Sequence, residues 1–126
     1  MTTDVPLEDR LRFIKHKGQV IFLLDFSHCN GKEMLLLLDQ VRADVARHAP
    51  GSVLTLGDFS GAHVDKAVAT KIQEVLVFDR PYVKKSAWVG TEDVPHIFFE
   101  HFKSFSQREI PTFPTREAAM DWLVEE

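Results

Sequence analysis

Two copies of the tripeptide Asp-Phe-Ser hold the side chains in this chain that are best suited to chemistry. Asp25-Phe26-Ser27 and Asp58-Phe59-Ser60 each follow a short apolar run, and Gly61 comes directly after the second copy. Two carboxylates at neighbouring strand ends could serve acid–base catalysis or bind a divalent cation. A phosphate on the Ser60 hydroxyl would add charge to its loop. The structural alternative is that these side chains only hydrogen-bond their own loops.

Both tripeptides depend on strands that end at the same edge of a sheet. Residues 53–56 form a short apolar run between turn residues, which is typical of a buried strand. Residues 20–24 are apolar on both faces and predict a central strand. A strand followed by a polar loop and a helix places that loop at the carboxyl edge of an α/β sheet, where such folds usually hold their sites. We therefore expect Asp25 and Asp58 on one rim.

Turn and capping signals predict the remaining elements in the order ββαβαβαβα. Strands are expected at residues 11–16, 19–27, 53–56, 82–89 and 109–113, the last at an edge because Pro111 interrupts its donors. Asn30, Asp65 and Thr115 are expected helix caps, and Thr91 or Asp93 is expected to cap a helix with Pro95 in its first turn. Helical crossovers require a mixed, mainly parallel sheet. The sequence predicts one α/β domain of about five strands and four helices over residues 11–126, after a loose leader at residues 1–10.

Composition and charge argue against several classes of function. The 126 residues are 44% hydrophobic and 27% charged, as in ordinary globular domains. The net charge of −4 argues against nucleic-acid binding, which needs a basic surface. The longest apolar runs are too short to span a bilayer. A single cysteine, Cys29, and an amino terminus without a signal-peptide pattern predict a cytoplasmic protein.

The loop Asp58-Phe59-Ser60-Gly61 resembles the Asp-x-Ser-Gly signature of STAS domains, the family of bacterial anti-sigma-factor antagonists. The predicted order of elements is also similar, and the nearest branch is the STAS-like proteins described as resembling the sporulation anti-sigma antagonist or the lipid-binding SEC14 domain. The resemblance implies a non-enzymatic regulatory module, with Ser60 as phosphoacceptor and an anti-sigma-type kinase or another switch protein as partner. The expected partner-binding loop comprises Asp58, Phe59, Ser60, Gly61, His63 and Asp65.

The third expected helix carries more apolar surface than packing on one core requires. An arc of about 100° is enough to reach a core, and it is already filled by Val94, Ile97, Phe98, His101, Phe102 and Phe105, which leaves Phe99 at its flank. Phe98, Phe99 and Phe102 are therefore a candidate face for a homodimer or an apolar ligand. The likeness to SEC14 domains implies a lipid-like ligand. The structural alternative is a helix that simply packs deeply.

Other polar groups also have a structural reading beside the chemical one. His28-Cys29 could supply a base and a nucleophile, but adjacent residues at a strand end point apart. His96 and Glu100 share a helix face, but two ligands do not complete a metal site. A small hydrolase using the rim of Asp25 and Asp58 is the least favoured hypothesis, since its oxyanion donors cannot be named. We expect no catalytic residue, metal or cofactor.

Overall fold

The computed structural model describes residues 6–106 and 110–125 of the chain. It confirms the predicted single α/β domain and its element order. The strands are β1 (Leu11–His16), β2 (Gln19–Asp25), β3 (Val53–Asp58), β4 (Val83–Val89) and β5 (Thr112–Phe113). The helices are α1 (Gly31–Val45), α2 (Lys66–Asp79), α3 (His96–Ser106) and α4 (Arg116–Leu123), with 3-10 turns η1 (Leu7–Asp9) and η2 (Thr91–Asp93). None of the described helices is long and apolar enough to cross a membrane.

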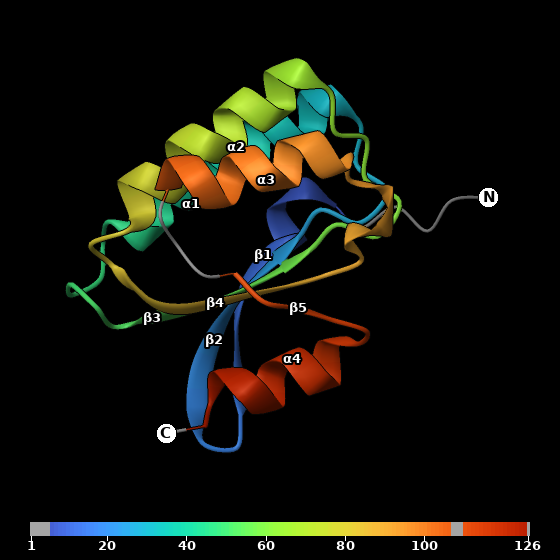
Figure 1. Ribbon diagram of the computed structural model, residues 1–126. Coiled ribbons are helices and arrows are strands. Elements are labelled where there is room, and N and C mark those ends of the chain that lie inside the picture. The colour runs from blue at the N-terminus through green and yellow to red at the C-terminus, as the bar shows by residue number, and fades with distance from the viewer. Residues whose placement is uncertain (1–5, 107–109, 126) are drawn as a thin grey trace.

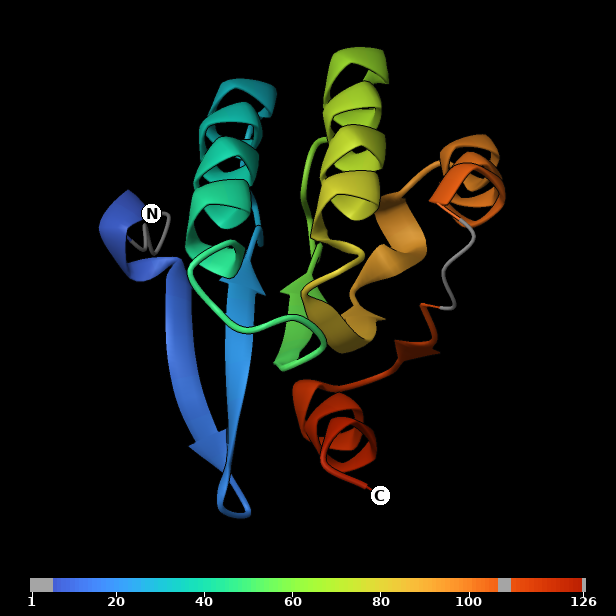
Figure 2. The same ribbon diagram turned by 90° about the vertical axis from the view of Figure 1, so that its left-hand side faces the viewer.

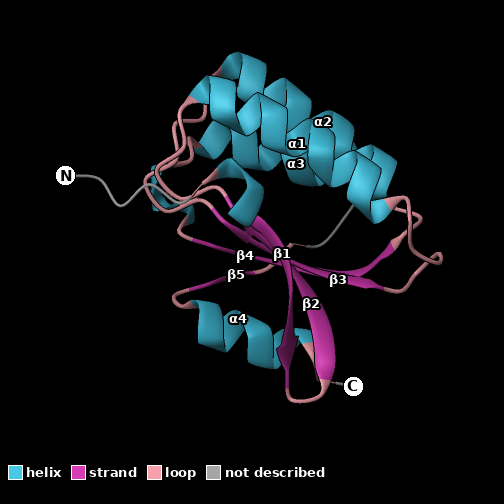
Figure 3. Ribbon diagram, turned by 180° about the vertical axis from the view of Figure 1, so that it is seen from behind, coloured by secondary structure: helices cyan, strands magenta, loops and turns pink. Residues whose placement is uncertain are grey.

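The five strands form one mixed sheet in the order β1-β2-β3-β4-β5. β1 pairs antiparallel with β2, and the other three pairs are parallel. Helices α1, α2 and α3 cover one face of the sheet, and α4 alone covers the other (Figures 1 and 3). This arrangement follows from the crossover connections, which place a helix between each parallel pair of strands. It confirms that β2 is central and that β5 is an edge strand.

The hairpin between β1 and β2 closes with a two-residue turn at Lys17 and Gly18. Both turn residues have positive φ, 51° and 83°, as a type I′ turn requires. Register runs from Leu11 opposite Leu24 to His16 opposite Gln19. Figure 2 shows this hairpin projecting beyond the parallel part of the sheet.

Side-chain caps fix the starts of three helices as predicted. Asn30 and Glu33 form the expected capping box at α1, with N···O distances of 2.8 and 2.9 Å. The Asp65 carboxylate accepts from the Val68 amide at the start of α2, and the Thr115 hydroxyl oxygen accepts from the Ala118 amide at the start of α4.

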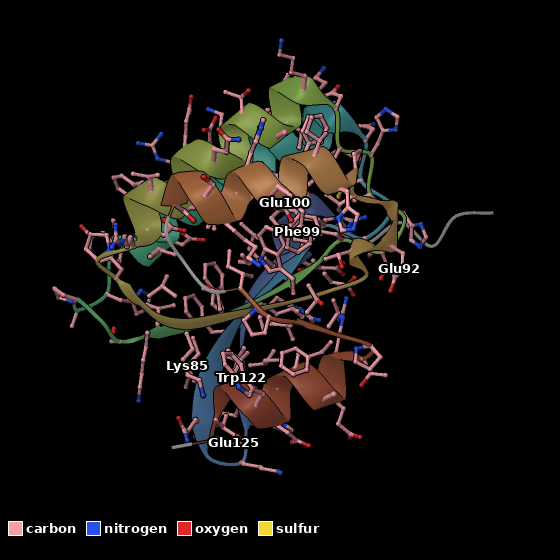
Figure 4. The ribbon with its side chains drawn as sticks, in the orientation of Figure 1. Lys85, Glu92, Phe99, Glu100, Trp122 and Glu125 are labelled. Carbon is pink, nitrogen blue, oxygen red and sulfur yellow. The ribbon has the colours of Figure 1, made fainter. Side chains whose placement is uncertain are left out.

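The sheet separates two hydrophobic cores. The larger core lies under α1, α2 and α3 and is centred on Phe22, Met34, Phe59, Val68 and Phe102. The smaller core lies under α4 and comprises Ile21, Leu23, Leu54, Leu56, Ala87, Val89, Ala119 and Leu123. Lys85 belongs to the smaller side, where its ammonium lies 4.2 Å from the centre of the Trp122 ring and donates to the Trp122 carbonyl oxygen (Figure 4). The apolar stem of Lys85 thus covers Trp122 while the charge stays near water.

Several element boundaries differ from the predictions, and β3 also runs two residues further than expected, to Asp58. β2 ends at Asp25 rather than at residue 27, because Ser27 turns back to donate to the Asp25 carboxylate. Residues 91–93 form the separate turn η2, so α3 begins only at His96 and Pro95 precedes it. β5 spans two residues, and Glu109, where a longer strand was predicted to start, lies outside the described residues.

Candidate functional site

The loops after β2 and β3 join into one surface at the carboxyl edge of the sheet. The Phe26 amide donates to the Asp58 carbonyl oxygen at 2.9 Å, and the His28 amide donates to the Ser60 carbonyl oxygen at 2.8 Å. The His63 amide donates to the Cys29 carbonyl oxygen at 3.0 Å. Because these three hydrogen bonds connect the two loops, the β2 loop and the β3 loop are held in one fixed arrangement.

Ser60 lies in a turn, two residues after the end of the central strand β3, where it is partly exposed. Its amide donates to the Asp58 carboxylate at 2.9 Å, which turns the chain after the strand. Gly61 and Gly90 both have positive φ, 65° and 68°. A methyl group on Gly61 would overlap the His28 ring, and one on Gly90 would overlap the Ser60 hydroxyl. The Ser60 side chain is therefore packed directly against the backbone that follows β4.

In the predicted partner-binding loop, Phe59 is buried and Gly61, His63 and Asp65 are exposed. Phe59 is 2% exposed and packs against Phe26 and Trp88, with ring centres 5.2 and 4.6 Å away. Phe59 consequently holds the loop from beneath, and its exposed neighbours form the surface that a partner could touch.

The two aspartates of the repeated tripeptide lie side by side, since Asp25 is the register partner of Asp58. Both side chains are nearly buried, on the face of the sheet that α4 covers. Arg116 bridges them: its Nε donates to Asp58 Oδ2 at 2.7 Å, and its Nη2 lies 3.3 Å from Asp25 Oδ1. Two charges of one sign are thus compensated by a guanidinium from the first turn of α4.

Arg10 supplies a second positive charge behind Asp25. It is 5% exposed, and its Nη1 lies 3.7 Å from Asp25 Oδ1. The same nitrogen donates to the carbonyl oxygens of Asp25 and Ser27 at 3.0 and 2.8 Å. Part of the expected loose leader is therefore anchored in the site through η1 and Arg10, while residues 1–5 lie outside the described residues.

Opposing effects set the pKa of Asp25. Burial raises this pKa, but the hydrogen bonds from the Ser27 hydroxyl and amide, together with the charges of Arg116 and Arg10, lower it more. The net pKa lies below the ordinary value of 3.8. Asp25 is thus held as a carboxylate, which suits an ion-pair network better than proton transfer near neutral pH.

The neighbouring residues His28 and Cys29 do not form a reactive pair. Cys29 is 1% exposed, and burial raises the pKa of its thiol to about 11. The neighbouring His28 is exposed, so the two side chains lie in different surroundings. Among the described residues, no group of three His, Cys, Asp or Glu side chains is placed to hold a metal ion.

The apolar arc of α3 is rotated relative to the predicted one. Ile97 is 63% exposed and His101 is exposed, so the prediction that both face the core was wrong. Phe102 is fully buried, and Phe98 and Phe99 are half-buried. The reason is aromatic packing from β4, since the Trp88 ring lies edge-on to Phe99 at 5.4 Å and to Phe102 at 5.7 Å. The side chain of Phe105 lies outside the described part.

A cleft of about 690 Å³ lies between α3, η2 and β5. Its apolar surface comes from Val94, Pro95, Phe99, Ile110 and Pro111. Charged and polar side chains complete the lining, namely Glu92, His96, Glu100 and Lys103, with Thr91 and Thr112. Figure 4 shows Phe99 and Glu100 on α3 and Glu92 beside it on η2. The volume is in the range of small-molecule sites.

Three residues that shape the site had no readable signal in the sequence. Arg10 is 15 residues from Asp25 in the chain, and Arg116 is 58 residues from Asp58. No spacing rule links an arginine to a carboxylate at such separations. Gly90 follows a strand as many turn glycines do, and only the fold reveals that Ser60 packs on it. The repeated Asp-Phe-Ser tripeptide and the strands that precede it were the sequence signals that pointed to this rim.

Comparison with known proteins identifies no relative of this chain. No family model matches the chain, and no curated protein sequence or solved structure is significantly similar to it.

Proposed function

We propose that this chain is a cytoplasmic, STAS-like regulatory module that binds a protein partner through residues 58–65 and is switched by phosphorylation of Ser60. The observation that carries the proposal is the position of Ser60. Ser60 lies in a turn after the central strand, where the residue is partly exposed and its hydroxyl packs against Gly90. The likeness of Asp58-Phe59-Ser60-Gly61 to the STAS signature supports the same role.

The packing around Ser60 gives the switch a physical basis. The Ser60 hydroxyl lies so close to Gly90 that even a Cβ atom at position 90 would overlap it, so a phosphoryl group has to extend away from Gly90 or displace it. The group also brings about −1.5 to −2 charges next to the Asp58 carboxylate, which already accepts from the Ser60 amide. Both effects change the shape and the charge of the exposed loop, so a partner that fits one state is disfavoured by the other.

The ion-pair network favours a binding role over a hydrolytic one. A paired-carboxylate hydrolase needs one carboxyl group free to take or give a proton. Asp25 and Asp58 instead both contact Arg116, and Asp25 also has Arg10. In the proposed module this network fixes the strand ends from which the partner-binding loop starts. The expected partner is an anti-sigma-type kinase or another switch protein.

Mass spectrometry of the protein isolated from its own cells tests the phosphorylation directly. Tryptic cleavage after Arg47 and Lys66 gives one peptide that contains both Ser52 and Ser60. We expect phosphate on Ser60 and none on Ser52, which is exposed and serves as an internal control. A peptide that is unmodified in growing and in starved cells, or modified at Ser52 alone, would contradict the switch.

A second candidate function is the binding of a lipid-like molecule in the cleft beneath α3. The specific observation in its favour is the cleft's volume of about 690 Å³ together with its apolar surface around Phe99. Phe99 also contacts Trp88, so a ligand against Phe99 should alter the fluorescence of that tryptophan. In a Trp122→Phe background Trp88 is the single tryptophan.

Titration of that variant with a medium-chain fatty acid tests ligand binding. We expect a saturable change in Trp88 fluorescence that is lost in Phe99→Ser and kept in Ile97→Ser, because Ile97 lies on α3 outside the cleft lining. Phe99 is only half-buried, so its replacement should cost less than the ~3–5 kcal/mol of a fully buried phenylalanine. An absent or unsaturable signal would exclude this ligand class.

A further inference from the structure

The outer edge of β1 presents unpaired backbone groups. The Asp25 amide donates to the Arg10 carbonyl oxygen, and hydrogen-bonded positions alternate along an antiparallel ladder. The register therefore directs the N–H and C=O groups of Arg12, Ile14 and His16 toward β2. Those of Leu11, Phe13 and Lys15 point away from the sheet. Since β1 is the end strand, no other described strand pairs with this edge.

The same edge carries a concentration of exposed apolar side chains, which we call the β1–α1 patch: Leu7, Leu11, Phe13 and Leu36. Leu7 is 38% exposed, Phe13 45% and Leu36 56%, and Leu11 is half-buried. A groove of about 490 Å³ runs between η1 and α1, with Leu7, Leu11 and Leu36 in its lining. The Phe13 ring stacks on buried Phe22 at 4.3 Å and so is held in one position. An ordered apolar patch beside an open strand edge is typical of an interaction surface.

We propose that a second copy of this chain pairs with the β1 edge, in an antiparallel strand pair centred on Phe13. In this register Phe13 lies opposite its own copy and Leu11 lies opposite Lys15, so all three outward residues bond across the two-fold axis. About six backbone hydrogen bonds would form. The apolar Phe13 rings meet at the axis and cover one another.

Charge and backbone hydrogen bonding favour the Phe13-centred register over its two neighbours. Pairing centred on Arg12 would place two arginines opposite each other, and pairing centred on Ile14 would leave the Leu11 groups unbonded. The Phe13-centred register opposes Arg12 to Ile14. It also brings the acidic residues Glu8 and Asp9, which are exposed on η1 just before β1, toward the exposed Lys15 near the end of β1 in the second copy. A second copy therefore supplies both the strand and the complementary charges, and this interface is independent of the proposed role of Ser60.

Light scattering after size exclusion, at micromolar concentrations, gives the first test. We expect a mass of about twice 14.4 kDa for the wild-type chain. Lys15→Pro removes an outward N–H and leaves the bonds to β2 intact, while Phe13→Glu places two like charges at the axis. Both variants should keep the wild-type circular dichroism and elute as monomers. The matched control is Val77→Glu, which alters a residue of similar exposure on α2 and should stay dimeric.

Disulfide trapping tests the register itself. Phe13→Cys should crosslink to a dimer under mild oxidation, since directly opposed strand residues lie within disulfide reach. Val77→Cys should not crosslink, and native Cys29 is buried at 1% exposure. A wild-type chain that is monomeric at micromolar concentrations would overturn the proposal, as would a dimer that survives both Lys15→Pro and Phe13→Glu. Equal crosslinking of the two cysteine variants would overturn the register.

Discussion

Replacing Arg116 by methionine would remove a side chain that contacts both aspartates of the site. Arg116 lies 2.7 Å from the Asp58 carboxylate and 3.3 Å from that of Asp25. Methionine keeps most of the stem and removes the charge. The variant therefore leaves two adjacent carboxylates on neighbouring strands, with Arg10 as the remaining positive charge near Asp25 among the described residues.

The expected loss of stability follows from the burial of the two aspartates. Removing one partner of a buried ion pair typically costs about 3–5 kcal/mol, because the other charge stays buried without compensation. Two features reduce this figure: the Arg116 side chain is 36% exposed, and Asp25 keeps Arg10. We therefore expect the free energy of unfolding at pH 7 to fall by about 2–3 kcal/mol.

The loss should depend on pH in a defined direction. The pKa of Asp25 is lower in the folded chain than its ordinary value of 3.8, so ionised Asp25 stabilises the fold above that value and this contribution is lost as the pH falls through the folded pKa. Arg116 contributes to the lowering, so the pKa of Asp25 should rise in the variant. The difference between wild type and Arg116→Met should therefore narrow below about pH 4.

Urea unfolding at a series of pH values measures both effects. The control is Arg47→Met, which removes an exposed arginine 3.9 Å from Asp44 and should cost at most about 0.5 kcal/mol. Adding Asp58→Asn to Arg116→Met should recover part of the loss, because the carboxylate that lost its arginine partner is then neutral. If Arg116→Met costs no more than the control at pH 7, the reasoning about this network is refuted.

Two further substitutions and one labelling experiment test other parts of the structure. Gly90→Ala should lower the free energy of unfolding by about 1–2 kcal/mol more than Gly51→Ala does, as measured by chemical denaturation. Both glycines have positive φ, but of the two only Gly90 packs against the Ser60 hydroxyl. Equal losses in the two variants would show that this contact is unimportant. Cys29 should react with a thiol reagent at pH 8 no faster than the protein unfolds locally or globally, because the thiol is buried and burial raises its pKa to about 11. Immediate labelling of Cys29 in the folded protein would contradict this. Asn30→Ala should lower the free energy of unfolding by about 1 kcal/mol, and an unchanged value would mean that the capping box contributes little.

The fold could be predicted from local signals because most elements carry their own boundaries. The Asn30 capping box, the two-residue turn at Lys17-Gly18 and the doubly apolar β2 each specify structure within a few residues. The order of elements then fixes the parallel sheet through its crossovers. No tertiary information is needed for these steps.

The site could be predicted only in part, because its chemistry depends on distant contacts. Asp25 and Asp58 fall on one rim once the strands are parallel, but their neutralisation by Arg10 and Arg116 joins the two ends of the chain. The rotation of α3 is a tertiary effect as well. Helical periodicity gave an arc that included Ile97, and packing on Trp88 moved the arc toward Phe99.

Capture of binding partners from native lysate, with three immobilised forms of the chain, tests the central claim most directly. The forms are wild type, Ser60→Asp and the control Ser104→Asp, which alters an exposed serine on α3 far along the chain from the loop. The account predicts a protein retained by wild type and by Ser104→Asp but lost from Ser60→Asp, with unchanged circular dichroism in all three. An identical set of proteins on all three forms would contradict a partner switch at Ser60.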